Sequence, residues 1–293
     1  MKARPFSEED FPVVAELLAD DERHHGRPVQ IGVNEVREWT STSDLANGSW
    51  LYEDADGAVA VGWTGTQGDV GFAIGVVHPR AKGTGLGAEL VDRSEAALRK
   101  REVARIHQFT IGGDSAAAAL LTARGYRDVR HFFEMAIQLD APPDVPPVSI
   151  ESLREEDARA FHAALDESFQ DHWEHHGQPF EEWWKRHSAN PNRDLSLWFL
   201  IRDGDEIAAV ARNEANRNGG GYVGALGVRR PWRGRGYAKA LLLHTFREFY
   251  ERGQPRVTLG VDAANPTGAT HLYERVGMHV EMENIVFEKR LAP

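Results

Sequence analysis

The stretch with the clearest chemical potential is the glycine-rich run Arg233-Gly-Arg-Gly-Tyr-Ala238. It lies between an expected strand and an expected long helix. Its small residues let a ligand approach the backbone closely, and the free N–H groups at a helix start favour an anion. Arg233 and Arg235 would add charge-assisted hydrogen bonds. The run therefore predicts a pyrophosphate site, with a tight structural turn as the alternative.

Composition narrows the class of protein. The 293 residues include 41% hydrophobic side chains, enough for a substantial core, and no cysteine. Disulfides, thiolate metal ligands and an acyl-cysteine intermediate are thereby excluded. A net charge of -11 argues against a nucleic-acid partner and suits a cationic acceptor. The N-terminus lacks the apolar core of a secretory signal, and no apolar run is long enough to span a bilayer, so we expect a cytoplasmic protein with no membrane partner.

The elements around the glycine-rich run must position it. Turn residues at 203–204 and 218–221 separate three apolar stretches, which predicts antiparallel hairpins. One strand-helix-strand crossover follows, and this mixed order predicts an α+β fold. The expected helices of the second half are 155–169, 180–188, 235–252 and a short one that starts after Asn265 with Pro266 in its first position, and the expected strands are 197–202, 207–213, 222–228, 256–261 and 279–289.

The chain repeats this pattern. The run Ala141-Pro-Pro-Asp-Val-Pro-Pro147 contains four prolines and predicts a stiff linker. Motifs on either side of it recur in the same order, for example Gly75-Val-Val-His-Pro79 and Gly227-Val-Arg-Arg-Pro231. We therefore expect two copies of one fold. The expected domains are residues 1–140 and 148–293, joined by the linker 141–147.

The motifs of the second half resemble a known family. The pattern Arg233-x-x-Gly236-x-Ala238 at the start of an amphipathic helix is similar to the pyrophosphate-binding signature of the GNAT superfamily of acyl-CoA-dependent N-acyltransferases. Asn265 and Tyr273 follow at the positions that this family uses. The tandem arrangement further resembles mycothiol synthase and its relatives. The resemblance implies two GNAT-like domains, each a mixed, mostly antiparallel sheet flanked by helices.

This resemblance also implies a reaction. A primary amine of a small molecule would attack acetyl-CoA directly while both are bound in one ternary complex. Backbone N–H groups near Leu226 to Val228 would polarise the thioester, Asn265 would hold the pantetheine arm, and Tyr273 would protonate the leaving thiolate. The alternative for Tyr273 is a core tyrosine. The implied cofactor-binding residues are Leu226, Gly227, Val228, Arg233, Gly234, Arg235, Gly236, Tyr237, Ala238 and Asn265.

The general base is not identified by the sequence. Mycothiol synthase relatives would have a glutamate early in the strand that precedes the glycine turn, where this chain has Gly221 or Tyr222. Glutamates on other strands could take the proton through water, although strand glutamates usually face solvent. The candidates are Glu214, Glu281 and Glu283.

The first half carries a reduced version of the same site. The sequence Lys82-Gly-Thr-Gly-Leu-Gly87 occupies the corresponding turn, which makes Lys82, Gly83, Gly85 and Gly87 a second candidate CoA site. Gly113 stands where the second half has Asn265, and Leu121 stands where it has Tyr273. We therefore expect the first domain to be catalytically silent.

The acceptor is expected to meet the segment Asp171-His-Trp-Glu-His-His176. Carboxylates and aromatic faces suit a cationic amine, so Asp171, Trp173 and Glu174 are the predicted acceptor contacts. A solvated, structurally repeated loop is the alternative. The His-His-Gly element at 175–177 recurs at 24–26, which indicates a turn role, and we expect no metal.

Two functions from different classes remain open. The leading hypothesis is an acetyl-CoA-dependent N-acetyltransferase that acts through the second domain, with a protein lysine or N-terminus as an alternative acceptor. The rival is a non-catalytic acyl-CoA-binding or scaffold protein. A monomer is favoured for either.

Overall fold

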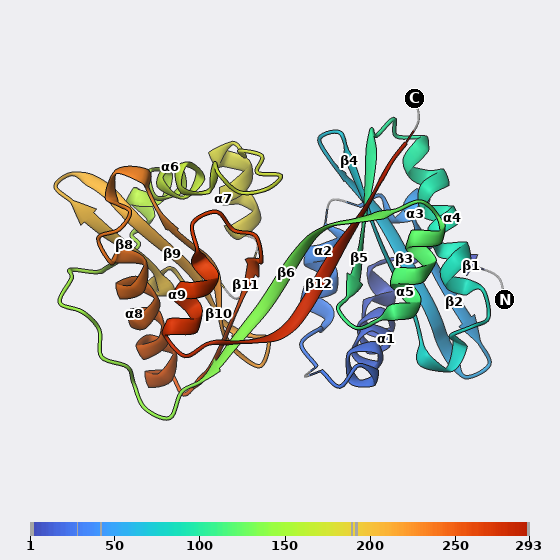
Figure 1. Ribbon diagram of the computed structural model, residues 1–293, viewed down its shortest axis with the longest axis horizontal. Helices are drawn as coiled ribbons and strands as arrows, with labels where there is room; N and C mark the ends of the chain where they lie inside the picture. Colours follow the sequence, from blue (N-terminus) through green and yellow to red (C-terminus); the bar gives the residue numbers. More distant parts are fainter. Residues whose placement is uncertain (1–2, 28, 42, 189, 191–192, 292–293) are drawn as a thin grey trace. The chain divides into compact units, whose positions relative to one another are not determined.

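The computed structural model describes residues 3–27, 29–41, 43–188, 190 and 193–291. The chain divides into two compact units (Figure 1). Unit 1 comprises Met1–His131 with Met282–Pro293, and unit 2 comprises Phe132–Glu281. Each unit contains a mixed sheet with helices packed on it, so the predicted α+β class with tandem domains is confirmed.

The sheet of unit 2 runs in the order β6-β11-β10-β9-β8-β7. β10 and β11 are parallel neighbours, whereas β9 pairs with β8 and β10 in antiparallel register, as the glycine-containing turns predict. The strands are β6 (Arg127–Gln138), β7 (Glu151–Ser152), β8 (Trp198–Asp203), β9 (Glu206–Arg217), β10 (Gly220–Val228) and β11 (Arg256–Asp262).

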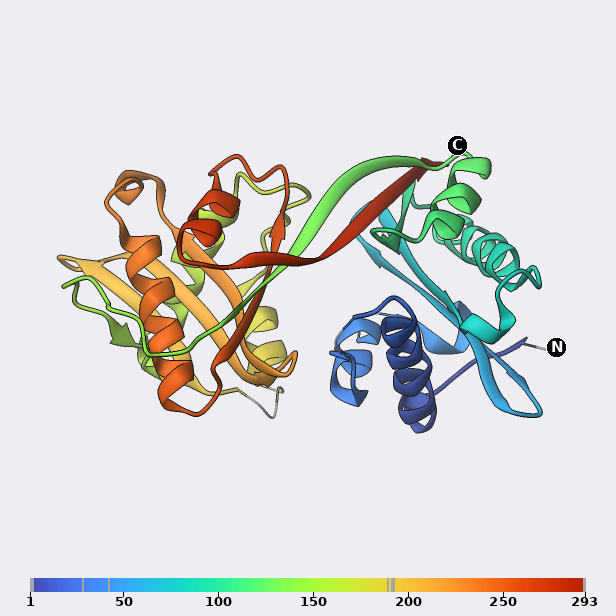
Figure 2. The ribbon, with the colours of Figure 1, turned by 60° about the horizontal axis from the view of Figure 1, so that its bottom comes forward.

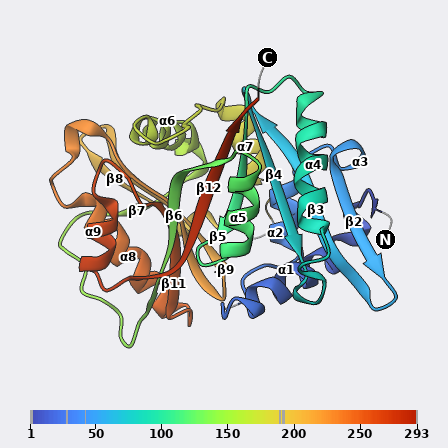
Figure 3. The ribbon, with the colours of Figure 1, turned by 45° about the vertical axis from the view of Figure 1, so that its right-hand side comes forward.

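Helices cover both faces of this sheet. Figure 3 shows α6 (Ala158–Phe169) and α7 (Phe180–Ser188) on one face, and α8 (Tyr237–Glu251) and α9 (Ala269–Arg275) on the other. Alternation along the strands explains the split: Trp198 stacks on Phe161 of α6, while the next residue, Phe199, meets His244 of α8. We call these the α6 face and the α8 face.

Unit 1 repeats the arrangement. Its sheet runs β1-β2-β3-β4-β5-β12, and Figure 2 shows the blue helices α1 and α2 on one side of it and the teal and green helices α4 and α5 on the other. The strands are β1 (Ala3–Arg4), β2 (Ser49–Asp54), β3 (Gly57–Gln67), β4 (Val70–Val77), β5 (Arg105–Ile111) and β12 (His279–Arg290), and the helices are α1 (Phe11–His24), α2 (Val33–Thr40), α3 (Leu45–Gly48), α4 (Leu86–Arg99) and α5 (Ser115–Ala123).

The two units exchange their last strands. β6 follows the helices of unit 1, yet its residues 132–138 pair with β11 in unit 2. β12 follows the helices of unit 2, yet its residues 284–290 pair with β5 in unit 1. The predicted boundaries at residues 140 and 148 mark the sequence repeat, whereas the compact units change over inside these two strands. No local sequence signal distinguishes the two pairings, because register is set by non-local contacts.

Most elements of the second half lie where they were predicted. The short last helix is the exception: it begins at Ala269, preceded by Gly268 with φ +70°, so Asn265 and Pro266 are not its cap and first residue. The proline-rich run 141–147 forms neither helix nor strand, and the Pro143 carbonyl accepts two hydrogen bonds from Arg247 of α8. Among the described helices, none is both long and apolar enough to cross a membrane.

The strand exchange predicts that a residue near the C-terminus stabilises unit 1. Phe287 of β12 is 5% exposed and packs with Leu98, Ile106 and Tyr126. Phe287→Ala should cost about 3–5 kcal/mol of unit 1 stability. Phe109→Ala on the neighbouring strand is the matched control, because Phe109 is 44% exposed. Hydrogen exchange resolved by segment measures both: faster exchange in unit 2 alone after Phe287→Ala would show that the pairing is wrong.

Candidate active site

The glycine-rich run forms an exposed turn between β10 and α8. Gly234 and Gly236 have φ angles of +80° and +82°, in the left-handed region that favours glycine. A Cβ built on either residue would meet nothing within 4 Å, so the turn is open on its outer side. Gly236 precedes the first residue of α8, and no side chain caps this helix start. The turn thus offers N–H groups and a positive helix end to an anion.

Arg233 braces this turn from within. Its guanidinium donates to the Val228 carbonyl at 3.2 Å, to the Ser168 carbonyl at 3.3 Å and to the Asp171 carboxylate at 3.1 Å. Asp171 also accepts from Arg230, and the two arginines hold the pKa of this carboxyl below its usual range. Asp171, a predicted acceptor contact, therefore faces the glycine turn, where it orients Arg233.

A second anchor lies on the other side of the turn. The Asp203 carboxylate, at the end of β8, accepts from the Trp232 indole at 2.7 Å and from Arg235 at 3.1 Å. Arg235 remains about half exposed. Its side chain lies at the rim of the turn, in a position to reach an incoming anion.

β10 and β11 part next to this turn. Within the described residues, their parallel pairing ends at Val223 and Leu259. Both strands continue beyond this point, β10 to Val228 and β11 to Asp262. The paired residues are Gly221 with Val257, Tyr222 with Thr258 and Val223 with Leu259. A bulge in β10 lies between Val223 and Ala225, at the same point. The bulge increases the local bend of β10 at the point where its pairing with β11 ends. We call the unpaired stretch beyond this point, between residues 224–228 of β10 and 260–262 of β11, the gap.

The open edge of β10 presents unpaired backbone groups. The Arg229 N–H donates to the Ala208 carbonyl on the β9 side at 3.0 Å. Because the N–H direction alternates along a strand, Gly227 also points to β9, whereas Leu226 and Val228 point into the gap. Gly227 is needed for a different reason, since a Cβ there would lie 2.7 Å from Ser168 Cβ of α6. Two of the predicted amides therefore face the gap, and the third residue lets α6 approach.

Asn265 and Tyr273 follow β11. The Asn265 Oδ1 accepts from the Thr267 N–H at 2.8 Å and its hydroxyl at 2.6 Å, which shapes the turn before α9. Tyr273 on α9 is 7% exposed, and burial raises its pKa to about 12. Within the described part of the chain, its hydroxyl has no hydrogen-bond partner. The phenol therefore stays protonated at neutral pH.

Trp173 reaches the α6 face. Its ring lies 6.0 Å from that of Phe132 on β6, centroid to centroid. Phe132 pairs with Asp262, at the end of β11. Glu174, the third predicted acceptor contact, has φ +54° and lies 3.7 Å from His176 within the same loop. The structure thus places Trp173 against the sheet of unit 2 and leaves Glu174 in the adjoining loop.

The three candidate bases are all bound by cations. Glu214 is 7% exposed and accepts from Arg212 at 2.5 Å and Arg217 at 2.9 Å, and these charges hold its pKa below the usual range despite burial. Glu281 receives two hydrogen bonds from Arg256. Glu283 belongs to unit 1 and lies 2.6 Å from His131.

A different glutamate stands beside the gap. Glu134 of β6 pairs with Gly260 of β11, one residue beyond the point where β11 leaves β10. The sequence does not indicate it, because Glu134 precedes the linker and lies in the expected first domain. The one local signal is a continuous apolar run, residues 132–137, that is interrupted by this single glutamate.

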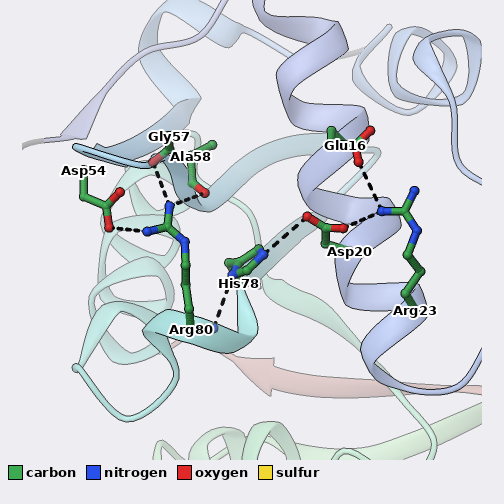
Figure 4. Close-up of polar contacts among 8 residues, drawn as sticks. All are labelled: Glu16, Asp20, Arg23, Asp54, Gly57, Ala58, His78 and Arg80. Carbon is green, nitrogen blue, oxygen red and sulfur yellow. Dashed lines mark hydrogen bonds and ion pairs between the residues drawn. The ribbon is translucent and has the colours of Figure 1, made fainter.

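Unit 1 has a similar glycine turn, but different residues surround it. Gly83 and Gly85 have φ angles of +81° and +90°. Figure 4 shows the braces near this turn: Arg80 donates to Asp54 at 2.6 Å, and His78 lies 3.3 Å from Asp20. Near the turn of unit 2, two carboxylates also accept from neighbouring side chains, Asp203 from Trp232 and Asp171 from Arg230.

The predicted leading cation of unit 1, Lys82, lies 3.9 Å from Asp21 and 3.7 Å from Asp114. β4 and β5 also part, after Ala73 and Gln108, but the register of β4 with β3 continues without a bulge in the described residues. The turn is retained, whereas its surroundings differ. In the described ranges, no cluster of three or more His, Asp or Glu side chains is arranged to hold a metal ion.

Comparison with known proteins agrees with this geometry. Residues 152–278 match the acetyltransferase (GNAT) family. A mycothiol acetyltransferase from Thermobispora bispora is 30% identical over 217 residues, which cover 69% of this chain and 70% of the relative. The crystal structure of a GCN5-related N-acetyltransferase from Sphaerobacter thermophilus is 32% identical, with a TM-score of 0.86 over 100% of this chain and 96% of that one.

The chain belongs to the GNAT family. It is an acetyl-CoA-dependent N-acetyltransferase. A tandem GNAT protein from the clavulanic acid biosynthesis pathway shares the fold, with a TM-score of 0.72 over 100% of this chain and 99% of that one at 13% identity. The predicted family resemblance and tandem organisation are confirmed.

The braces of the GNAT turn predict unequal roles for its two arginines. Arg233→Met removes donors from two carbonyls and one carboxylate and should destabilise unit 2 by about 1–3 kcal/mol. Arg235→Met removes one exposed ion pair and should cost at most about 1 kcal/mol. Urea unfolding followed by segment-resolved hydrogen exchange measures both. Equal losses for the two variants would contradict the bracing role of Arg233.

Proposed function

We propose that unit 2 transfers an acetyl group from acetyl-CoA to a primary amine of a small molecule, by direct attack within a ternary complex. The observation that carries this proposal is the combination of an open glycine turn at the start of α8 with the gap between β10 and β11. The turn suits a pyrophosphate and the gap suits an extended arm that ends in a thioester. The absence of cysteine from the sequence agrees with direct attack, since no cysteine can hold the acetyl group.

The residues of unit 2 fit acetyl-CoA. The amides of residues 234–238 and the Arg235 side chain would bind the pyrophosphate, while Arg233 holds the turn in shape. The Leu226 and Val228 amides would bind the thioester oxygen and stabilise negative charge that develops on it. Asn265 would meet the arm with its amide nitrogen, because its oxygen is engaged by Thr267. When bound, acetyl-CoA supplies the activated acetyl group.

Tyr273 is suited to be the general acid. Its burial keeps the phenol protonated, and helix α9 lies on the α8 face, because the Gly277 backbone that follows it packs against Ile137. Ile137 pairs with Val257, and Val257 pairs with Gly221, so all three share one face of the sheet. This is the α8 face, because Phe249 of α8 lies over Gly221. A proton donated there would neutralise the departing thiolate.

The acceptor would enter on the α6 face. Trp173 and Phe132 offer aromatic surface, and Glu134, Glu174 and Asp262 offer carboxylates, a combination that suits a cationic amine. The relative from Thermobispora bispora is a mycothiol acetyltransferase, which supports a small-molecule acceptor. An amino sugar conjugate, an aminoglycoside, a polyamine and an amino acid derivative all have this chemistry.

Unit 1 is proposed to be catalytically silent. Leu121 occupies the helix position that Tyr273 holds in unit 2, and it is 3% exposed in the core. Lys82, Gly83, Gly85 and Gly87 remain a second candidate CoA site, although two carboxylates lie close to Lys82. The rival function, a non-catalytic acyl-CoA-binding or scaffold protein, would require unit 2 to be silent as well.

Amine-dependent release of CoA tests the function. The full chain is incubated with acetyl-CoA and, one at a time, glucosamine, kanamycin, spermidine, lysine methyl ester and a lysine-containing peptide, and free thiol is measured. Release with at least one small amine supports the proposal. Release with the peptide alone would favour a protein acceptor. Acetyl-CoA binding without any amine-dependent release would favour the rival.

Tyr273→Phe should lower kcat for CoA release by about a hundredfold or more, because the thiolate loses its proton donor. With a folded pKa near 12, wild-type Tyr273 should cause no loss of activity between about pH 7 and 10, since the acid form persists throughout. Tyr250→Phe is the control: its hydroxyl donates to the Asp140 carbonyl at the surface, and its kcat should be unchanged. Full turnover of Tyr273→Phe at every pH would refute the assignment.

A further inference from the structure

We propose that Glu134 is the general base of unit 2, the group that takes the proton of the acceptor amine directly or through one water. This inference rests on the proposed function and extends it to a residue outside the predicted second domain. β6, an exchanged strand, brings the glutamate from the first half of the sequence to the catalytic gap.

The register of three strands places Glu134 at the apex of the gap. β11 leaves β10 after Leu259, and the next residue, Gly260, pairs with Glu134. Side chains opposite each other on paired strands point to the same face of a sheet. Gly260 has no side chain to separate Glu134 from β10. The glutamate can therefore face the apex across the backbone of β11.

The side chain of Glu134 lies on the α6 face of the sheet. Tyr222 pairs with Thr258, and Thr258 lies two residues from Gly260 on the same side of β11. The neighbouring Gly221 faces the other way, where its Cβ position lies 2.4 Å from the Phe249 ring of α8. Trp173 packs on Phe132, two residues from Glu134 on β6. Glu134, Tyr222 and Trp173 thus share the side from which the acceptor is proposed to enter.

Tyr222 links Glu134 to the gap. Its hydroxyl lies 3.7 Å from the Cβ position of Gly260, directly opposite Glu134 in register. Burial raises the pKa of Tyr222, and the negative charges of Glu134 and Glu214 raise it further against the opposing effect of Arg217 and Arg212. The hydroxyl thus remains a neutral hydrogen-bonding group beside the glutamate, able to orient the amine or a water.

Two other carboxylates near the apex, Glu214 and Asp262, accept hydrogen bonds from groups close by. Glu214 is held by two arginines, which stabilise its charged form and make it a weak proton acceptor. Asp262 lies on the same face two residues beyond Gly260, where it accepts from the Ala264 N–H at 3.0 Å and stands near His172. The charged and titratable groups around the apex are Glu134, Glu214, Tyr222, Arg212, Arg217, His172 and Asp262.

Unit 1 supplies an internal comparison. There the strand pair equivalent to β11 and β6 is β5 and β12, and Phe109 pairs with Val286 where unit 2 has Gly260 and Glu134. Phe72 pairs with His107 where unit 2 has Tyr222 and Thr258. The fold therefore does not require a glutamate at this position. Glycine, glutamate and tyrosine occur together only in the unit that also has Tyr273.

In the proposed step, the acceptor amine displaces the thiol of CoA from the acetyl group. The amine nitrogen forms a bond to the thioester carbon, and the carbon–sulfur bond breaks. The cationic amine first gives one proton to the Glu134 carboxylate and becomes the neutral nucleophile. After the bond to carbon has formed, the second proton of nitrogen passes to solvent, and the thiolate takes the proton of Tyr273. Glu134 lies on the α6 face and Tyr273 on the α8 face, so proton acceptance and donation occur on opposite sides of the opened sheet. Solvent exchange then restores both groups.

Glu134→Gln in the full chain tests the assignment. The amine of the five-compound panel that the wild type turns over fastest serves as the probe. Near pH 7, kcat should fall about a hundredfold or more while the calorimetric Kd of acetyl-CoA stays within about twofold. The deficit should shrink towards about pH 9.5, where the amine loses its proton to solvent unaided. Glu134→Asp should recover part of the rate, and Glu206→Gln, an exposed strand carboxylate, should match the wild type.

Each alternative outcome is decisive. If the wild type releases no CoA with any amine of the panel, the proposed function fails and the base assignment fails with it. If the wild type is active and Glu134→Gln equals it at every pH, the base assignment alone is overturned. A deficit that is the same at every pH and accompanied by weaker acetyl-CoA binding would mean that Glu134 has a structural role, which also overturns the assignment.

Discussion

The function proposed for unit 2 depends on the end of the pairing between β10 and β11. A continuous ladder would pair every amide of β10 and leave no room for a substrate in the sheet. The bulge between Val223 and Ala225 coincides with the end of the ladder after Val223 and Leu259, and beyond it the Leu226 and Val228 amides point away from β9. The same separation gives two faces to the reaction, one lined by the α6 side and one by α9.

The glycine turn depends on a second constraint, its ion pairs. Arg233 is held by two carbonyls and by Asp171, so the helix start keeps its shape without a capping side chain. In unit 1, other side-chain pairs hold the corresponding turn: Arg80 donates to Asp54, and His78 lies beside Asp20. The turn geometry is thus common to both units, and the residues around the gap distinguish unit 2, the proposed catalytic unit, from unit 1.

Much of this was predictable from local sequence. Periodicity and turn residues located the strands and helices of the second half, and the glycine-rich run located the turn at which we propose the anion site. Features set by distant contacts were not predictable. The sequence placed β6 and β12 each in its own half, because nothing local shows that the sheets exchange them. The sequence predicted Asp171 as an acceptor contact, because nothing local shows that this carboxylate pairs with Arg230 and Arg233, about sixty residues further along the chain.

The same limit hid Glu134. A search for the base within the second half could find only Glu214, Glu281 and Glu283, and each has a cation beside it in the structure. The exchange of strands carries a carboxylate into the site from more than a hundred residues away along the chain, as the pairing of Glu134 with Gly260 shows. A repeat therefore need not carry all of its own catalytic residues.

Calorimetric titration of acetyl-CoA into the wild type, Gly236→Glu and Gly85→Glu tests the central claim that the working site lies in unit 2. The two substitutions are matched, because both glycines have left-handed φ angles and open surroundings at equivalent helix starts. We predict that Gly236→Glu abolishes both binding at the unit 2 site and amine-dependent CoA release, while Gly85→Glu preserves turnover. Turnover lost in Gly85→Glu and retained in Gly236→Glu would contradict the account.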